Sequence, residues 1–151
     1  MNTLKTTINA DLKTAMIARD VVRTQTLQGL KAAILNEEVA QNIRDTGLDD
    51  NLIEQIVARE VKKRDEAALL YEKGGNQESA TKERAEKEIL AIYLPKQLSE
   101  GELDALIDTV IVTLQPSGMK DMGKVIGAVK TQVGNAGDGS LIAKLVKQKL
   151  Q

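Results

Sequence analysis

Apolar residues recur along this chain at intervals of three and four positions, which is the period of an amphipathic helix. A first helix is therefore expected near the N-terminus, capped by Asn2 or Thr3. Its apolar stripe consists of Leu4, Ile8, Leu12 and Met16. A second helix is expected from about Asp20, with Leu27, Leu30, Ile34 and Val39 on its apolar face. Gly29 interrupts this helix at a cost of about 1 kcal/mol relative to alanine, and we interpret it as the site of a close helix crossing.

Two further helices are expected after a polar loop at residues 44–50. Asp49 or Asp50 caps the third helix, which ends at Gly74-Gly75. Its apolar side consists of Ile53, Val57, Val61, Ala68 and Tyr71. The fourth helix is expected over Gln77–Leu94 and is closed by Pro95. Its predicted buried positions are Ala85, Ile89, Ile92 and Tyr93.

The last third of the chain predicts three shorter helices. Ser99 and Glu102 have the spacing of a capping box, which opens a fifth helix. Its apolar residues are Leu103, Leu106, Ile107, Val110, Ile111 and Leu114. Two short helices follow at about Asp121–Val133 and Ser140–Leu150, the second capped by Ser140. Helices this short are marginal alone, so the three should pack as one unit. The pattern therefore predicts an all-α fold with a larger N-terminal helical domain, residues 1–95, and a small three-helix tail domain, residues 96–151.

The composition supports a helical reading and removes several kinds of chemistry. Hydrophobic residues make up 42% of the 151 residues, yet the only aromatics are two tyrosines, so the core must be aliphatic. Without cysteine or histidine the chain lacks thiol nucleophiles, the commonest general base and the commonest metal ligands. We expect no metal and no cofactor. No apolar run approaches the ~20 residues of a membrane span, and the first residues lack the apolar core of a secretory signal, so we expect no membrane partner and a cytoplasmic location.

Charge is balanced overall but unevenly distributed. The 21 basic and 22 acidic residues give a net charge of −1, so no global field attracts nucleic acid. Residues 120–151 carry six lysines against Asp121 and Asp138, a local charge of +4, whereas residues 1–119 carry −5. The two ends of the chain therefore differ in the partners they favour.

No constellation in the sequence predicts catalysis. The Gly134–Ser140 loop has part of a phosphate-loop spacing, but it lacks the lysine and follows a helix rather than a strand, so we interpret it as a flexible turn. Asp138 alone offers too few oxygen ligands for calcium. The neighbouring acids Glu37 and Glu38 diverge by about 100° on a helix and are interpreted as solvated surface. No serine–lysine motif is visible either.

Two groups of basic residues are candidate nucleic-acid contacts. Arg59, Lys62 and Lys63 share a face of the third helix at spacings of three and four. Acidic residues interleave with them, so a salt-bridged surface is the alternative. The second group lies in the tail, where a plain solvated face is the alternative. It comprises Lys120 and Lys124, which flank a helix start, and Lys144 and Lys147, which lie three apart.

Two glycines could add to the tail group. Gly123 and Gly127 lie four apart on one helix face and would let a nucleic-acid backbone come close. Tight packing between helices is the alternative, because glycine otherwise only weakens a helix. The sequence leaves both interpretations open.

Several segments in order resemble the YqeY-like family, whose fold also forms the C-terminal tail of the B subunit of the amidotransferases that convert Glu-tRNA(Gln) or Asp-tRNA(Asn). They lie at residues 27–37, 60–66, 88–99, 121–128 and 138–141. The most specific are Tyr93–Leu98, which reads YLPKQL, and Met122–Gly127, which reads MGKVIG. Together the segments cover the chain from end to end.

The resemblance implies an all-helical larger domain, a three-helix tail domain and kinship with modules that contact tRNA. The glutaminase, kinase and transamidase chemistry belongs to other domains and subunits of that enzyme and is not carried over. The chain departs from the family at two basic positions. It has Gly75-Asn76 where the family often has glycine–arginine, and its last glycine loop, Gly134–Gly137, contains no lysine or arginine.

Our leading hypothesis is a non-catalytic binding module for tRNA or aminoacyl-tRNA, with Lys124, Lys144 and Lys147 as the main phosphate contacts. One alternative is a protein–protein adaptor whose short tail helices dock a partner of the translation or tRNA-charging machinery. Another is an auxiliary part of a carbon–nitrogen ligase that uses glutamine as the amide donor, which rests on kinship alone.

Overall fold

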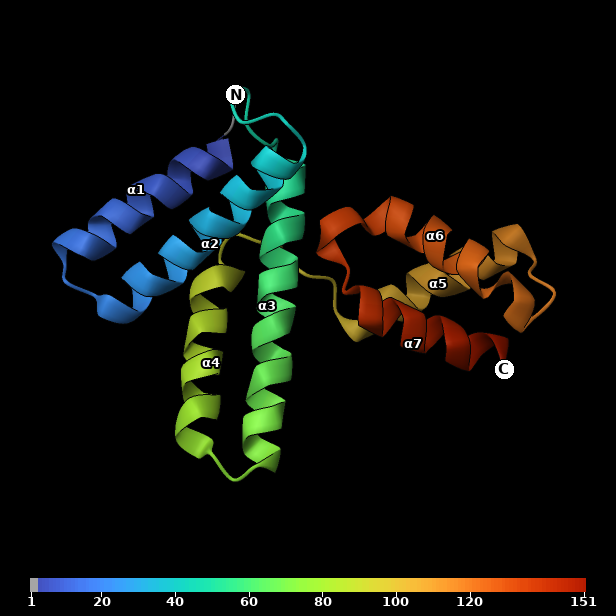
Figure 1. Ribbon diagram of the computed structural model, residues 1–151. Coiled ribbons are helices and arrows are strands. Elements are labelled where there is room, and N and C mark those ends of the chain that lie inside the picture. Colours follow the sequence, from blue (N-terminus) through green and yellow to red (C-terminus); the bar gives the residue numbers. More distant parts are fainter. Residues whose placement is uncertain (1–2) are drawn as a thin grey trace. The chain divides into compact units, whose positions relative to one another are not determined.

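A computed structural model describes residues 3–151, and within that range every regular element is a helix (Figure 1). No strand occurs in these residues, so the all-α prediction is confirmed. The chain divides into two compact units between Leu94 and Pro95, one residue from the predicted boundary. We call them the N-terminal unit and the tail unit. That the N-terminal unit folds without the tail unit stays a prediction.

The N-terminal unit contains four helices: α1 (Thr3–Ile17), α2 (Val21–Ala40), α3 (Asp50–Lys73) and α4 (Gln77–Ala91). The carboxylates of Asp20 and Asp49 cap α2 and α3, and the Asn76 amide oxygen caps α4. The buried core joins all four helices and the loop before α3. It consists of Ile8, Leu12, Leu27, Leu30, Ile34, Leu48, Ile53, Ile56, Val57, Leu90 and Tyr93.

Some predicted core positions of this unit are wrong. A stripe with a repeat of four drifts by about 40° per step around a helix of 3.6 residues per turn, so Met16 has left the inner face that Ile8 and Leu12 occupy. Ala15 is buried instead. Val39, Tyr71, Ala85 and Ile92 are also exposed. The fourth helix ends at Ala91, three residues before the predicted end, and Ala80 and Leu90 are its buried residues.

Two further interpretations of α2 are corrected. No atom lies within 4 Å of the position that a Cβ on Gly29 would take, so this glycine does not mark a close helix crossing. Glu38 is not solvated surface, because only 2% of it is exposed. The Lys5 ammonium lies 2.6 Å from its Oε1, and the backbone N–H of Leu48 donates to the same oxygen at 3.2 Å. A buried ion pair therefore links α1, α2 and the loop before α3.

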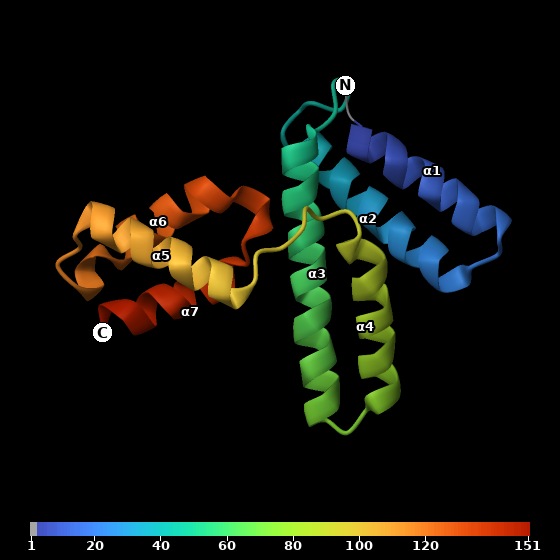
Figure 2. The ribbon, with the colours of Figure 1, turned by 180° about the vertical axis from the view of Figure 1, so that it is seen from behind.

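Helices α3 and α4 lie side by side as a long hairpin that turns at Gly74–Asn76, as both ribbon views show (Figures 1 and 2). The large buried aliphatics of this hairpin lie in the half away from that turn. In the half next to the turn the buried residues are Ala68 and Ala80. Ion pairs flank them, including Arg84–Glu72 at 2.6 Å and Lys87–Asp65 at 2.8 Å. This half of the hairpin is therefore held by small side chains and charges.

The tail unit contains α5 (Glu100–Leu114), the short 3-10 helix η1 (Met119–Asp121), α6 (Met122–Val133), a second 3-10 helix η2 (Gly134–Ala136) and α7 (Gly139–Leu150). The predicted capping box is confirmed, since Glu102 N–H donates to Ser99 Oγ at 3.1 Å and Ser99 N–H donates to the Glu102 carboxylate at 2.8 Å. The core lies between the three α-helices. It consists of Leu103, Ile107, Val110, Val125, Val129, Ile142, Leu145 and Val146.

Two details of the tail unit differ from prediction. Leu114 is exposed at the end of α5. Helix α7 is capped by Asp138 rather than by Ser140, and the Asp138 carboxylate accepts the Ser140 N–H at 2.9 Å. The loop before α7 packs closely against the end of α6 at Gly137, where a Cβ would lie only 2.5 Å from Val133 Cγ2. Only glycine fits there without movement of the α6 end.

Candidate nucleic-acid interface

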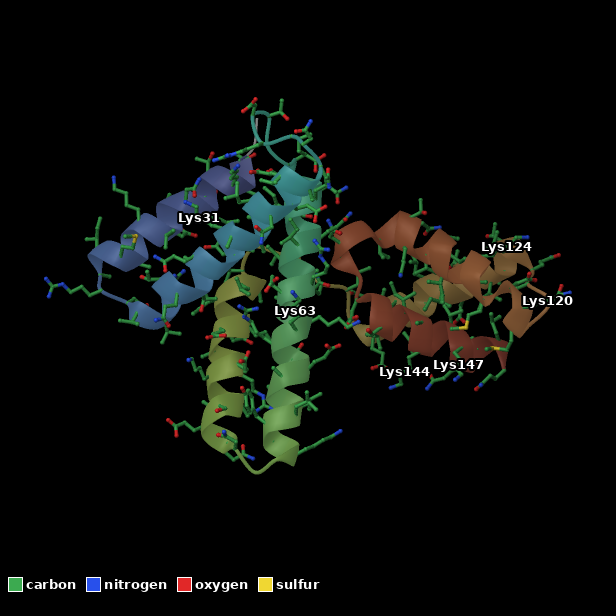
Figure 3. The ribbon with its side chains drawn as sticks, in the orientation of Figure 1. Lys31, Lys63, Lys120, Lys124, Lys144 and Lys147 are labelled. Carbon is green, nitrogen blue, oxygen red and sulfur yellow. The ribbon has the colours of Figure 1, made fainter. Side chains whose placement is uncertain are left out.

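The exposed face of α7 carries the first two candidate lysines. Because α7 buries Ile142, Leu145 and Val146, Lys144 and Lys147 project outward one turn apart (Figure 3). Within residues 3–151, no carboxylate lies within 4.0 Å of either ammonium group. Both side chains are therefore available to an external anion.

Lys120 lies in η1 and Lys124 in the first turn of α6, on either side of Asp121 in the sequence (Figure 3). Both are exposed, and neither forms an ion pair in the described part of the chain. Asp121 accepts the Ser117 N–H at 2.7 Å. This hydrogen bond, helped by the positive charges of Lys124 and Lys120, holds the pKa of the Asp121 carboxyl below its ordinary value. Asp121 thus stays ionised and offsets one of the two cations.

The fold changes the charge balance that the sequence suggested. Since α5 packs in the same unit as α6 and α7, residues 95–151 must be counted together. They carry seven lysines and six carboxylates, a net charge of +1 rather than the local +4 of residues 120–151. Lys149 lies 2.6 Å from Asp108 and 3.0 Å from Asp104, and these contacts raise its pKa. Lys149 therefore holds α7 to α5 and adds little to an anion-binding surface.

The two glycines of α6 lie on an open face. Gly123 and Gly127 are exposed, and no atom lies within 4 Å of a Cβ built on either. Tight helix packing therefore does not explain them, whereas close approach of an external backbone remains sterically possible. A hollow of about 230 Å³ lies beside this helix, lined by Leu114, Pro116, Asp121, Lys124, Val125 and Ala128.

The basic group on α3 has a different character. Arg59 lies 3.6 Å from Glu37, and Lys63 lies 3.3 Å from Glu60 on its own helix. Lys62 is exposed and has no carboxylate within 4.0 Å in the residues that the structure describes. The alternative of a salt-bridged surface thus describes two of these three residues. The group offers one fully available cation, fewer than α6 and α7 together.

Sequence reasoning missed a hollow of about 220 Å³ between α1 and α2. Its lining is Lys5, Ile8, Asn9, Lys31, Ala32, Ile34, Leu35 and Glu38. Lys31 of α2 is exposed and is one of the lining residues of this hollow (Figure 3). One signal of this hollow was present in the sequence. Glu38 lies four residues after Ile34 on the inner face of the helix, where an aliphatic residue would be expected. A third hollow, between α2 and α3, includes Arg59 and Glu37 in its lining.

Residues 3–151 contain no group of three or more acidic side chains arranged to hold a metal ion. Among the described helices, none combines the length and the apolar character needed to cross a membrane.

Comparison with curated proteins finds fungal relatives named "Altered inheritance of mitochondria protein 41, mitochondrial". The protein from Lachancea thermotolerans is 30% identical over 112 residues, which are 73% of this chain and 59% of that protein. The one from Kluyveromyces lactis is 29% identical over 113 residues, 73% of this chain and 60% of the relative. The one from Eremothecium gossypii is 31% identical over 126 residues, 81% and 67% respectively. The match thus spans about three fifths of the first two relatives.

These names correct the predicted location. They place the relatives in mitochondria, so the expectation of a cytoplasmic protein is wrong. That expectation rested partly on the lack of the apolar core found in secretory signals. Mitochondrial leaders are amphipathic and have no such core, so its absence does not argue against mitochondria. A family model described as "Yqey-like protein" matches residues 5–150, almost the whole chain, and the chain therefore belongs to the YqeY-like family.

Proposed function

We propose that this chain is a tRNA-binding module without catalysis of its own, and that Lys120, Lys124, Lys144 and Lys147 contact RNA phosphates. The observation that carries the proposal is the set of exposed lysines on η1, α6 and α7 without carboxylates within 4.0 Å in residues 3–151. Phosphate contacts of this kind supply most of the sequence-independent affinity for nucleic acid. The family's resemblance to the amidotransferase tail supports tRNA as the ligand.

The open face of α6 gives the proposal a second support. Phosphate oxygens or ribose can approach the helix at Gly123 and Gly127, where no side chain stands between backbone and solvent. Lys124 lies on the same helix between these glycines. A nucleic-acid backbone lying along this face would therefore meet a cation and a close-approach site together.

The charges predict a weak complex with a modest dependence on salt. Asp121 offsets one of the two cations at the start of α6, so Lys124, Lys144 and Lys147 count as about three phosphate contacts. Three contacts give a slope of about −2 to −3 in log affinity against log salt. Binding at physiological salt should accordingly be in the micromolar range or weaker.

The test is the triple variant Lys124→Gln/Lys144→Gln/Lys147→Gln, which keeps helix propensity and removes three charges. A matched control, Lys13→Gln/Lys73→Gln/Lys82→Gln, removes three exposed lysines from the N-terminal unit. In filter-binding titrations at several salt concentrations, the control should bind tRNA like the parent. The tail variant should melt like the parent but lose most of the affinity and most of the salt slope. Equal binding by the tail variant and the parent contradicts the proposal.

A second function, a protein–protein adaptor, is favoured by apolar residues exposed on the tail unit. Val112, Leu114 and Met119 are exposed, and Leu114 lines the hollow beside α6. A partner held there would bind through apolar burial, which high salt does not weaken. Retention of a cellular protein by the immobilised chain in high salt and after nuclease treatment would favour this alternative.

The proposal includes the absence of ammonia transfer by the isolated chain. With no histidine or cysteine, it lacks the usual nucleophiles and bases for releasing ammonia from glutamine. A coupled ammonia assay on the purified protein, with and without charged tRNA, should remain at the level of the blank. Activity in a preparation free of amidotransferase subunits would contradict the non-catalytic assignment.

A further inference from the structure

The corner between α1 and α2 exposes four large apolar side chains within seven residues. Met16 and Ile17 end α1, and Val21 and Val22 begin α2. Ile17 is 75% exposed and Val21 63% exposed, while Met16 and Val22 are also exposed. These residues lie away from the inner faces of both helices, so they add nothing to the core. We call residues 16–22 the apolar corner.

The corner is held in a fixed shape. Arg19 has a φ of 55°, a left-handed conformation that is unusual for a residue with a side chain. The Asp20 N–H donates to the Ala15 carbonyl at 3.0 Å, and the Asp20 carboxylate accepts the Arg23 N–H at 3.1 Å to cap α2. These contacts join the end of α1 to the beginning of α2 by a tight turn at one end of the N-terminal unit (Figures 1 and 2).

Cations flank the apolar side chains. Lys13 and Arg19 are exposed and have no carboxylate within 4.0 Å in the described part of the chain. Arg23 is not counted among these cations, because its charge acts on Tyr93. The Tyr93 hydroxyl in turn donates to Asp11 at 2.6 Å. The acidic residue within residues 16–22 is Asp20, whose carboxylate caps α2. The surface thus combines exposed aliphatic groups with a modest excess of positive charge.

We propose that the apolar corner inserts into the surface of an anionic phospholipid membrane. Ile17 and Val21 would enter the boundary between headgroups and acyl chains, and Lys13 and Arg19 would contact lipid phosphates. Amphipathic surfaces of this kind bind through buried apolar area together with attraction to anionic lipid. The sequence-based expectation of no membrane partner rested on the absence of a spanning segment, whereas this contact requires none.

The shape of the corner favours lipid over a protein partner. None of the three hollows described above is lined by residues 13–22. A stable protein interface also buries roughly 800 Å² on each side. A corner of four apolar side chains is too small for that, while a fluid lipid surface needs no complementary shape.

The experiment is sedimentation of the full chain with vesicles made of equal parts phosphatidylglycerol and phosphatidylcholine, compared with phosphatidylcholine alone. The test variant is Ile17→Ser/Val21→Ser. Its matched control is Ile92→Ser/Val112→Ser, because these residues, 60% and 74% exposed, have similar exposure outside the corner. We expect the parent and the control to sediment with the anionic vesicles. The corner variant should lose about tenfold or more in partitioning, since two aliphatic side chains no longer enter the lipid.

Two further arms identify the source of binding. Lys13→Gln/Arg19→Gln should reduce partitioning into anionic vesicles toward the level seen with phosphatidylcholine. The tail variant Lys124→Gln/Lys144→Gln/Lys147→Gln should sediment like the parent, which separates this proposal from RNA binding. The proposal is wrong if the parent does not sediment, if the corner variant sediments equally well, or if the tail variant abolishes sedimentation. It is also wrong if the corner variant changes the sedimentation coefficient of the protein without vesicles, because the corner would then be a protein contact.

Discussion

The buried ion pair between Lys5 and Glu38 allows a quantitative test of how the N-terminal unit is held together. Replacing Lys5 by methionine keeps an aliphatic stem but removes the ammonium that lies 2.6 Å from the carboxylate. Glu38 then keeps its negative charge in a position that is only 2% exposed. The Leu48 N–H remains as a donor to that carboxylate, whereas the ion pair with Lys5 is lost.

The exposed fraction of the Lys5 side chain, 35%, sets the size of the effect. Breaking a fully buried ion pair costs about 3–5 kcal/mol, and screening by water lowers this, so we expect Lys5→Met to reduce the free energy of unfolding by about 2 kcal/mol. Adding Glu38→Gln removes the stranded charge and keeps an oxygen that can accept the Leu48 N–H. The double variant should therefore recover about 1 kcal/mol of the loss.

The assay is urea unfolding at neutral pH followed by far-ultraviolet circular dichroism, with Lys82→Met as a control for loss of an exposed lysine. The control should unfold at almost the same urea concentration as the parent. If Lys5→Met costs no more than the control, the ion pair behaves like a surface pair. If Glu38→Gln adds its own loss to that of Lys5→Met, the explanation by a stranded charge is refuted.

Three other measurements address separate features. Cleavage between Lys96 and Gln97 should leave an N-terminal fragment that melts cooperatively, because all large buried aliphatics of its core precede the cut; a gradual melt would show that the tail completes that core. Burial, with the hydrogen bond to Asp11, raises the pKa of Tyr93, so the folded state favours the neutral phenol. The stabilisation by the neutral Tyr93 phenol is complete below the ordinary tyrosine pKa of about 10 and is lost as the pH rises above that value. The melting temperature should therefore fall less steeply with pH in Tyr93→Phe than in the parent. Equal slopes would contradict this. Gly29→Ala should stabilise the protein by up to about 1 kcal/mol in the same urea assay, because the added methyl meets open space, and destabilisation would restore the close-crossing interpretation.

The local signals in the sequence were sufficient for the fold class and most helix ends. The capping box at Ser99 and Glu102, the cap at Asp49 and the stop at Gly74 each act within a few residues, so they can be read without tertiary information. Burial at the margins of a helical face could not be predicted in this way. Val39 lies exposed while its neighbour Glu38 is buried, because Lys5 from another helix supplies the countercharge. That partner is 33 residues distant along the chain.

The candidate site was predictable to a similar depth. The spacing of Lys144 and Lys147 on a helix with an opposite apolar face was enough to expect both on the outside. The tail charge was overestimated because the acids of α5 belong to the same unit, and Asp104 and Asp108 engage Lys149 there. Whether Gly123 and Gly127 face a neighbouring helix or solvent depends on how α6 packs, which only the three-dimensional structure provides.

The division of the α3–α4 hairpin into two kinds of packing has a consequence for its motions. Next to the turn at Gly74–Asn76, alanines and partly exposed ion pairs hold the helices, and these contribute little to cohesion. Opening this half exposes few large aliphatic side chains, so it requires much less free energy than opening the half that contains Ile53, Val57 and Leu90. Amide hydrogens on either side of the turn should therefore exchange with solvent by local fraying, faster as salt weakens the ion pairs, while those near Val57 exchange only when the whole unit unfolds.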